Sequence, residues 1–232
     1  MEIDEIHPWN ISVEEADSIQ DKLKMRLSKI KQGMSQPKKI ELIAACDVDY
    51  SSDSLDISAA AIIFRFPELY IAEEVIVRKR ESHLFPYIPG LLSFREGPLL
   101  IEALKKIESD PQIILFDGQG IAHPKRMGLA THLGLLLDKS TIGCAKSFLY
   151  GVYEDPVNMG GSYSLLKDEN GELIGGVIRT QKDVKPIFVS PGYKIDSKTS
   201  IDIVLSCVKS YRIPEPLRIA HMKARDGLIK GN

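Results

Sequence analysis

The amino-acid sequence predicts an α/β fold in which helices flank a mixed central sheet. Two observations support this prediction. Three strand-like segments follow one another with short links between residues 38 and 80, which is typical of an antiparallel meander. Helical and strand-like patterns then alternate between residues 93 and 149, which favours parallel strands joined by helical crossovers. No repeat, linker or low-complexity tract divides the 232 residues, so we expect one domain, with residues 1–39 as an N-terminal helix and arm packed on it.

The first part of the chain is expected to hold one helix and three strands. Residues 12–31 have the apolar spacing of an amphipathic helix, and Ser12 and Glu15 have the S-x-x-E spacing of a capping box. The β-branched and apolar runs that follow predict strands at 38–51, 57–66 and 70–80. The third strand alternates polar and apolar residues, so we expect it at an edge of the sheet with one face in solvent.

The rest of the chain is expected to alternate between strands and helices. The patterns predict strands at 112–116, 140–149, 170–180 and 186–192, and helices at 93–109, 124–138, 197–212 and 216–230. A meander followed by such crossovers gives a mixed sheet. Several α/β folds are compatible with it, so the fold alone does not assign a function.

Composition and charge narrow the class of protein. The chain is 44% hydrophobic and 27% charged, as globular domains are, and its three cysteines show no C-x-x-C spacing, which favours free thiols in a reducing compartment. A formal net charge of −2 excludes an overall basic field. The Lys- and Arg-rich segment 209–230 is therefore a candidate phosphate-binding patch, with a solvated helix face as the alternative. We expect a cytoplasmic monomer that is neither secreted nor inserted in a membrane.

Asp47 and Asp117 each end an apolar strand, where ligands collect in α/β sheets. If the two strands are neighbours, both carboxylates lie within reach of one cation, and Mg²⁺ prefers such oxygen ligands. The alternative is that each aspartate only caps a turn. Asp49 lies two residues after Asp47 and so points to the same face of the strand, which makes it an alternative ligand.

Glu96 also has two interpretations. Ser93 and Glu96 have S-x-x-E spacing, so the glutamate could complete a helix capping box, and this is the interpretation that the local pattern favours. The functional interpretation places a third carboxylate at a helix start beside the edge of the sheet.

Two loops carry further candidates. In FPYIPG (85–90) two prolines stiffen a loop that presents Tyr87, which suits a wedge pushed into a base stack, or else a tight turn with the ring on the core. Gly90, Gly118 and Gly120 permit close approach of the backbone to a ligand, although most such glycines simply form turns.

Three basic or titratable side chains complete the set. Lys146 could stabilise charge developing on a phosphate, with an exposed strand-end lysine as the alternative. His123 could position a phosphate or water, but a loop histidine with satisfied hydrogen bonds is more common. His221 lies in a predicted helix, where a packed histidine is the usual case.

The wording and order of the motifs are more specific than any of these signals. From about residue 40 to about residue 222 the chain closely resembles endonuclease V, in the segments FPYIPGLLSFREGPL, ILFDGQGIAHPKRMGLATHLGL, TIGCAKSFLYG and RIPEPLRIAH. The resemblance implies a ribonuclease H-like fold and a requirement for Mg²⁺, for which Mn²⁺ substitutes. It also implies hydrolysis of the second phosphodiester bond 3′ to a deaminated base, chiefly deoxyinosine in DNA, leaving 3′-hydroxyl and 5′-phosphate ends.

The resemblance also implies roles for individual residues. Asp47 and Asp117 correspond to the metal ligands, and Glu96, His221 and Lys146 complete the catalytic group. The residues that correspond to the DNA-binding set are Tyr87 as the wedge, with Ile88, Pro89, Gly90, Gly118, Gly120 and His123. Asp49 departs from the family pattern, which usually has a small or apolar residue there, and could contribute to metal binding.

Two other functions remain open at this point. The first is an endoribonuclease specific for inosine in RNA, which would use the same residues. The second is a binder of altered nucleic acid that does not cleave, although three clustered acids facing phosphates would serve no purpose in such a protein.

Overall fold

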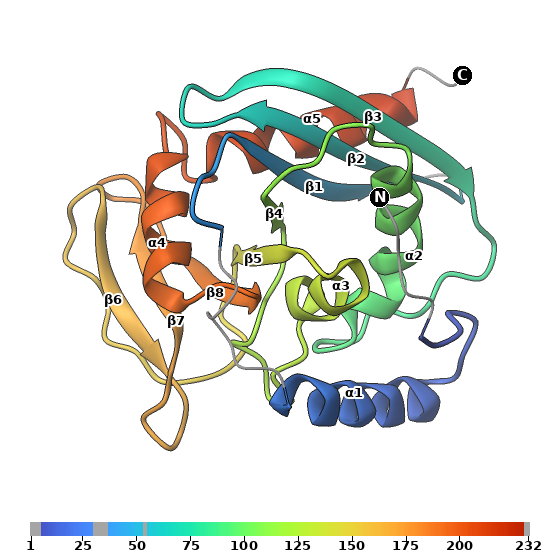
Figure 1. The fold of residues 1–232 in the computed structure, drawn as a ribbon, viewed down its shortest axis with the longest axis horizontal. Coiled ribbons are helices and arrows are strands. Elements are labelled where there is room, and N and C mark those ends of the chain that lie inside the picture. Colours follow the sequence, from blue (N-terminus) through green and yellow to red (C-terminus); the bar gives the residue numbers. More distant parts are fainter. Residues whose placement is uncertain (1–5, 30–36, 53–54, 230–232) are drawn as a thin grey trace.

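A computed structural model describes residues 6–29, 37–52 and 55–229, and its centre is one sheet (Figure 1). Within these residues the sheet has eight strands in the order β3-β2-β1-β4-β5-β8-β7-β6. The strands are β1 (Leu42–Tyr50), β2 (Asp56–Arg65), β3 (Tyr70–Arg80), β4 (Ile113–Phe116), β5 (Ser140–Ala145), β6 (Ser162–Lys167), β7 (Leu173–Arg179) and β8 (Ile187–Tyr193). The helices are α1 (Val13–Ser28), α2 (Leu92–Lys105), α3 (Leu129–Leu137), α4 (Ser197–Ser206) and α5 (Glu215–Ile229). The predicted α/β class with a mixed sheet is confirmed.

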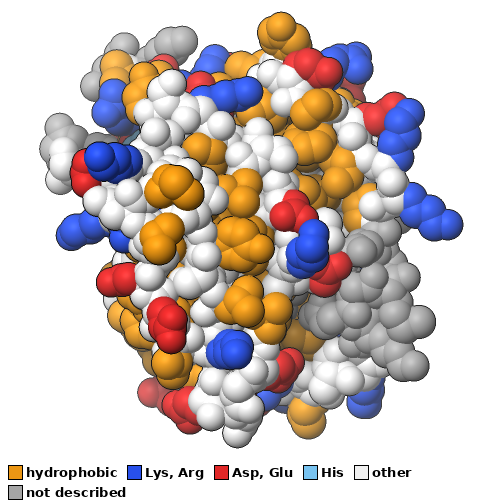
Figure 2. Space-filling model, turned by 90° about the vertical axis from the view of Figure 1, so that its left-hand side faces the viewer, with side chains coloured by type: hydrophobic (Ala, Val, Ile, Leu, Met, Phe, Trp, Pro, Cys, Tyr) orange, Lys and Arg blue, Asp and Glu red, His pale blue; other side chains and the backbone are white. Residues whose placement is uncertain are grey.

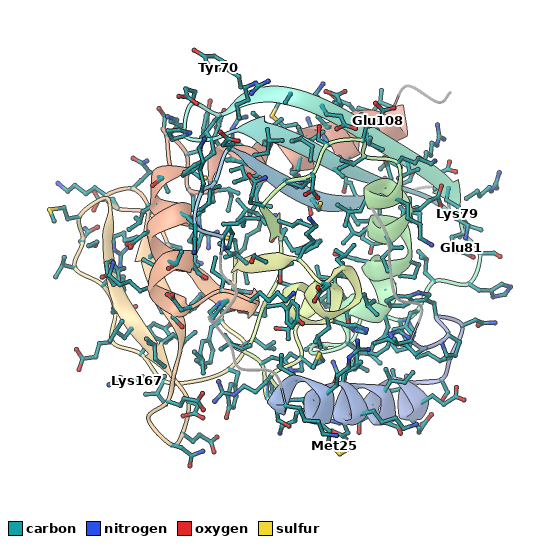
Figure 3. All side chains as sticks on the ribbon, in the orientation of Figure 1. Met25, Tyr70, Lys79, Glu81, Glu108 and Lys167 are labelled. Atoms are coloured by element: carbon teal, nitrogen blue, oxygen red, sulfur yellow. The ribbon has the colours of Figure 1, made fainter. Side chains whose placement is uncertain are left out.

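Strands β1, β2 and β3 form the predicted antiparallel meander. β1 and β2 are largely buried on both faces, whereas most of β3 is exposed or half-buried. Tyr70, Lys79 and Glu81 project outward from the two ends of β3 (Figure 3). Charged side chains such as those of Lys79 and Glu81 discourage an exposed edge from pairing with another chain. The prediction of an edge strand is therefore confirmed.

The parallel centre of the sheet decides where the site forms. β4 pairs in parallel with β1 on one side and with β5 on the other, with Cys46 opposite Phe116 and Phe116 opposite Gly143. The carboxyl ends of these strands therefore meet at one edge of the sheet. The residues that follow the first pair, Asp47 and Asp117, become neighbours.

Helices cover both faces of the sheet (Figure 1). α2 and α3 pack on the face that carries Ala44 and Cys46, and α4 and α5 pack on the face that carries Ile43 and Ala45. Because side chains alternate along a strand, Asp47 belongs to the α5 face. Helix α2 approaches the same edge of the sheet from the opposite face, so α2 and α5 reach the site from different sides.

A chain of hydrogen bonds ties the N-terminal segment to α2 and α3. Ser93 Oγ lies 2.8 Å from His132 Nδ1, His132 Nε2 lies 2.7 Å from His7 Nε2, and His7 Nδ1 lies 2.8 Å from Pro8 O. Only His7 Nδ1–H can donate to the carbonyl, so the direction follows: Ser93 donates to His132, which donates to His7. Both imidazoles are neutral in this arrangement. We call these residues the histidine chain; Trp9 stacks on His132 with the ring centroids 5.5 Å apart.

Helix α1 begins with the capping box that the sequence predicted. Ser12 Oγ accepts from the Glu15 N–H at 3.2 Å, and Glu15 Oε2 accepts from the Ser12 N–H at 2.8 Å. Leu23 and Leu27 bury the inner face of the helix. The predicted helix residues 30–31 and 230, and residues 1–5 and 30–36 of the predicted arm, lie outside the described residues.

Several elements differ from the expectation: the strand predicted at 140–149 ends at Ala145 and the helix predicted at 197–212 ends at Ser206, and two further differences bear on the fold or the site. β6 was missed because its apolar and polar residues alternate over only six positions at the far edge of the sheet, where Tyr163 and Leu165 face solvent. α3 begins at Leu129 rather than at residue 124, since Arg126 has φ of +60°, which no right-handed helix allows. A loop that borders the site takes the place of the predicted first helical turn.

The surface on the β6 side mixes exposed apolar side chains with acidic and basic ones (Figure 2). The apolar side chains include Val157, Met159, Tyr163 and Leu165. No helix in the described part of the chain is both long and apolar enough to cross a membrane.

Candidate active site

Asp47 and Asp117 lie side by side at the carboxyl edge of the sheet. Asp117 directly follows β4, and its N–H donates to Cys46 O at 3.5 Å, which extends the parallel ladder to the aspartate itself. Burial raises the pKa of Asp117, and the negative charge of Asp47 raises it further. The structure thus brings together the two carboxylates that the sequence placed at strand ends.

Two basic side chains contact this pair. His221 Nδ1, from α5, donates to Asp47 Oδ2 at 2.7 Å, and Lys146 Nζ donates to Asp117 Oδ2. The hydrogen bond to Asp47 raises the pKa of His221. Burial lowers the pKa of Lys146, but the carboxylates outweigh burial and the net shift is upward. Each aspartate therefore has its own basic partner.

Glu96 reaches the same edge from α2, on the opposite face of the sheet. Tyr50 Oη donates to Glu96 Oε1 at 3.3 Å. Burial, then the charges of Asp47 and Asp117, raise the pKa of Glu96 to about 8. Glu96 thus adds a third carboxyl group to a site that already holds more negative charge than burial favours.

The predicted capping box of Ser93 and Glu96 is wrong. α2 begins at Leu92 after an N-cap at Leu91, and no side chain caps it. Ser93 lies inside the helix and binds His132, while Glu96 binds Tyr50. Both side chains have partners outside their own helix, so neither is available to cap it.

A cavity of about 440 Å³ opens beside the carboxylates, within the usual range of ligand pockets. The site residues predicted from the sequence that line it are Asp47, Tyr87, Ile88, Pro89, Gly90, Glu96, Asp117, Gly118, His123, Lys146 and His221. A larger cavity of about 680 Å³ lies between Trp9 and the end of β3, and none of the three carboxyl groups lines it. The chemistry therefore points to the smaller cavity.

The loop at 85–90 holds Tyr87 out into solvent. Phe85 O accepts from Arg95 Nη1 at 2.7 Å, and Gly90 O accepts from His123 Nε2 at 2.9 Å. Between these two anchors the side chain of Tyr87 is 71% exposed. The alternative in which this ring lies on the core is wrong.

His123 is a buried, neutral histidine that holds this loop. Its Nδ1 accepts from the Lys125 N–H at 3.1 Å, so the proton is on Nε2, which donates to Gly90 O. Burial lowers the pKa of His123 to about 4. Gly90 has φ of +90°, which favours glycine at this position. The contacts of His123 match the loop histidine that was the alternative in the sequence.

The two glycines of DGQG have different surroundings. Gly118 lines the cavity, whereas Gly120 does not. The Gly120 N–H donates to Ser190 Oγ at 2.8 Å, and a Cβ on Gly120 would lie 2.2 Å from Pro191 O. Gly120 therefore lies close against β8, and this packing accounts for the glycine without a ligand.

Asp49 stands apart from the carboxylates. Its Oδ1 accepts from the Tyr50 N–H at 3.0 Å, and the residue does not line the cavity. Of the two aspartates at the end of β1, Asp47 is the one that faces Asp117.

The basic side chains of segment 209–230 are less available to bind phosphate than the composition of the segment indicates. Arg212 Nη2 donates to Lys146 O at 2.5 Å, which fixes the backbone beside the site. Arg218 pairs with Glu215 at 2.7 Å, and Lys223 pairs with a glutamate of β3 at 2.5 Å. Much of this charge is therefore used in contacts within the protein.

Residues 22–222 match the protein family described as Endonuclease V. The Endonuclease V of Trichormus variabilis is 46% identical over 220 residues, which cover 95% of this chain and 97% of the relative. The chain belongs to the endonuclease V family. It is accordingly an endonuclease, a hydrolase that acts on nucleic acid.

Solved structures of endonuclease V share the fold. The enzyme from Bacillus subtilis superimposes with a TM-score of 0.88 at 33% identity, over 100% of both chains. Ciona intestinalis Endonuclease V, in complex with a 24mer DNA containing an inosine followed by a ribo-adenosine, superimposes with a TM-score of 0.81 at 28% identity, over 95% of this chain and 99% of that one. These matches agree with the ribonuclease H-like fold that the sequence motifs implied.

Two residues of this endonuclease V site were missed from the sequence. Tyr50, the partner of Glu96, lies three residues after Asp47, and only the fold brings it to α2. Gln119 stands between the two glycines of DGQG and lines the cavity. Its position between the two glycines of the motif was the signal in the sequence that could have identified it.

Proposed function

We propose that this chain cleaves DNA at deaminated bases, chiefly deoxyinosine. It hydrolyses the second phosphodiester bond on the 3′ side of the lesion and leaves 3′-hydroxyl and 5′-phosphate ends. The observation that carries the proposal is the position of Asp47, Asp117 and Glu96 beside a cavity of about 440 Å³. Enzymes that act at a damaged base need a pocket for the extruded base and a reactive group near the phosphate. The inosine-containing DNA bound by the Ciona relative supports this substrate class.

A divalent cation fits the donor set. Burial, and then repulsion among the carboxylates, raises the pKa values of Asp117 and Glu96, and a hard cation bound at this edge would offset both effects. Asp47 and Asp117 would hold Mg²⁺, or Mn²⁺ in its place, which would supply activation of water and stabilisation of the leaving oxygen. Among the described residues no three His, Cys, Asp or Glu side chains are arranged to hold a metal. Two carboxylates with water and phosphate oxygens are a usual set for Mg²⁺.

The other site residues act on the substrate or orient the ligands. Lys146 stabilises negative charge on the phosphate, since its ammonium already lies at the carboxylate edge. His221 orients Asp47 through their hydrogen bond. Glu96 holds a proton or a water at the reacting phosphate, as its raised pKa allows.

The loop at 85–90 handles the DNA around the lesion. Tyr87 fills the gap left by the displaced base, a task that suits an exposed ring on an anchored loop. Ile88 and Pro89, together with Gly90 and Gly118, border the cavity that receives the base.

The test is cleavage of end-labelled strands, each with one inosine, in Mg²⁺. We expect a cut one nucleotide beyond the lesion by the wild type and no cut by Asp117→Asn, which keeps the size of the side chain. No cut on any strand by a wild type that still binds the lesion would show a binder instead.

An inosine-specific endoribonuclease is the second candidate. The Ciona complex supports it, because a ribonucleotide follows the inosine in that strand. Cleavage of matched DNA and RNA strands in the same assay decides between the two, since the faster strand identifies the substrate.

A further inference from the structure

Gln119 presents a buried hydrogen-bond acceptor that the protein leaves unpaired. The residue is 8% exposed, and its Nε2 donates to Ser147 O at 3.1 Å. Its Oε1 is buried and has no hydrogen-bond partner among the described residues. Such an atom is costly unless a ligand pairs with it.

The location of Gln119 separates it from the other unpaired groups. Ser58 Oγ and Thr131 Oγ1 are also buried without a partner within the described residues, but neither residue lines the cavity. Gln119 does, between Gly118 and the Ser147 loop. It is the member of this group that a bound base could reach.

The orientation of the amide is determined by its surroundings. Rotating the amide by 180° would set Oε1 against Ser147 O, so that two acceptors would face each other. The backbone is held too, because Gln119 O accepts from the Ala130 N–H at 3.0 Å. The acceptor is therefore preorganised before any substrate binds.

Deamination changes a base at the atom that such an acceptor reads. Adenine has a bare N1, which accepts a hydrogen bond, whereas hypoxanthine has N1–H, which donates one. We propose that Gln119 Oε1 accepts a hydrogen bond from N1–H of the flipped hypoxanthine and so selects it against adenine. This inference rests on the proposed function and adds a residue that determines specificity. Guanine also carries N1–H, so the contact does not bear on guanine.

The test compares two substrates in each of two enzymes. One strand carries deoxyinosine and the other carries deoxynebularine, a purine with a bare N1 and no 6-substituent. We expect Gln119→Met, which keeps the length of the side chain without its polar atoms, to lower kcat/KM for inosine about 10- to 100-fold. The value for nebularine should change less than about twofold, since that base lacks the N1–H donor.

The control is Thr131→Val, which removes an unpaired buried hydroxyl away from the cavity. It should leave the inosine-to-nebularine ratio unchanged. The ratio is independent of the fraction of folded enzyme, because both substrates meet the same molecules. If Gln119→Met does not fold, Gln119→Leu also removes both polar atoms and should lower the inosine-to-nebularine ratio by a similar factor.

The outcomes are distinct. An unchanged inosine-to-nebularine ratio in Gln119→Met or Gln119→Leu overturns the role of Gln119 while the proposed function stands. A wild type that cuts neither strand overturns the proposed function and this inference together.

Discussion

Two buried polar clusters meet on α2, one helical turn apart, and they differ in how their polar groups are paired. Ser93 belongs to the histidine chain, and Glu96 belongs to the carboxylate group with Asp47 and Asp117. In the histidine chain every polar atom has a neutral partner within the protein. In the carboxylate group the charges repel one another and open onto a cavity.

The pKa shifts express this difference. Burial and neighbouring charges raise the pKa of Glu96 to about 8, so full ionisation of the carboxylate group is unfavourable. Burial lowers the pKa of His132 to about 3, so the histidine chain resists protonation. The first cluster needs a cation or a substrate to complete it, while the second is complete and serves stability.

The largest expected effect comes from the carboxylate group. Asp117→Asn should lower Mg²⁺-dependent cleavage about 10³-fold or more, because it removes a metal ligand and its charge. Unfolding should occur at an equal or higher temperature, because the variant also removes repulsion with Asp47. Single-turnover cleavage and thermal melting measure the two effects. A variant that melts lower would mean that the aspartate is structural.

The histidine chain should show the reverse pattern. His132→Ala should reduce the free energy of unfolding by about 3 kcal/mol, since it leaves a cavity and removes the partner of Ser93 and His7. Urea denaturation measures this. Loss of activity without loss of stability would break the comparison and place His132 in the chemistry.

The pH dependence of stability should sharpen the contrast. The folded-state pKa of His132 is about 3, below its ordinary value of 6.5, so between these values the unfolded chain binds more protons. Stability contributed by neutral His132 is therefore complete above about pH 6.5 and falls by about 1.4 kcal/mol per unit as the pH drops toward 3. Denaturation of the wild type and His132→Gln at pH 7, 6 and 5 tests this, because the variant should lack that slope.

Tyr87 should affect substrate handling alone. Tyr87→Ala should lower kcat/KM on inosine-containing DNA about tenfold, the effect of one lost base-stacking contact. Its melting temperature should not move, since the ring is 71% exposed. Tyr70→Ala is the matched control, with the same exposure at the far end of β3, and should change neither quantity. Equal losses in both variants would contradict the wedge role.

The smallest effect is expected at Asp49. Its carboxylate accepts a hydrogen bond from the Tyr50 N–H, and the residue does not line the cavity. Asp49→Ser should therefore leave the Mg²⁺ concentration for half-maximal cleavage within about twofold, because serine can accept the same local bond. A clear rise in that concentration would restore Asp49 as a contributor to metal binding.

Local patterns were sufficient for much of the fold. Apolar runs identified β1 and β4, and parallel pairing then made Asp47 and Asp117 neighbours. The side-chain period fixes only the face on which each residue lies, so the adjacency of β1 and β4 and their register were decided by the sheet. The sequence missed β6, whose six residues carry too weak an alternation to stand out.

The S-x-x-E pattern occurs twice among these elements and shows that local spacing alone does not decide whether a capping box forms. At Ser12 and Glu15 it forms the capping box, because no neighbouring element competes for the two side chains. At Ser93 and Glu96 the same spacing gives no cap, because His132 and Tyr50 bind those side chains instead. The sequence by itself determined the helix, the strands and the two strand-end carboxylates, since these follow from local periodicity. Only tertiary packing decided that Glu96 faces the cavity, because its partner comes from another element of the fold.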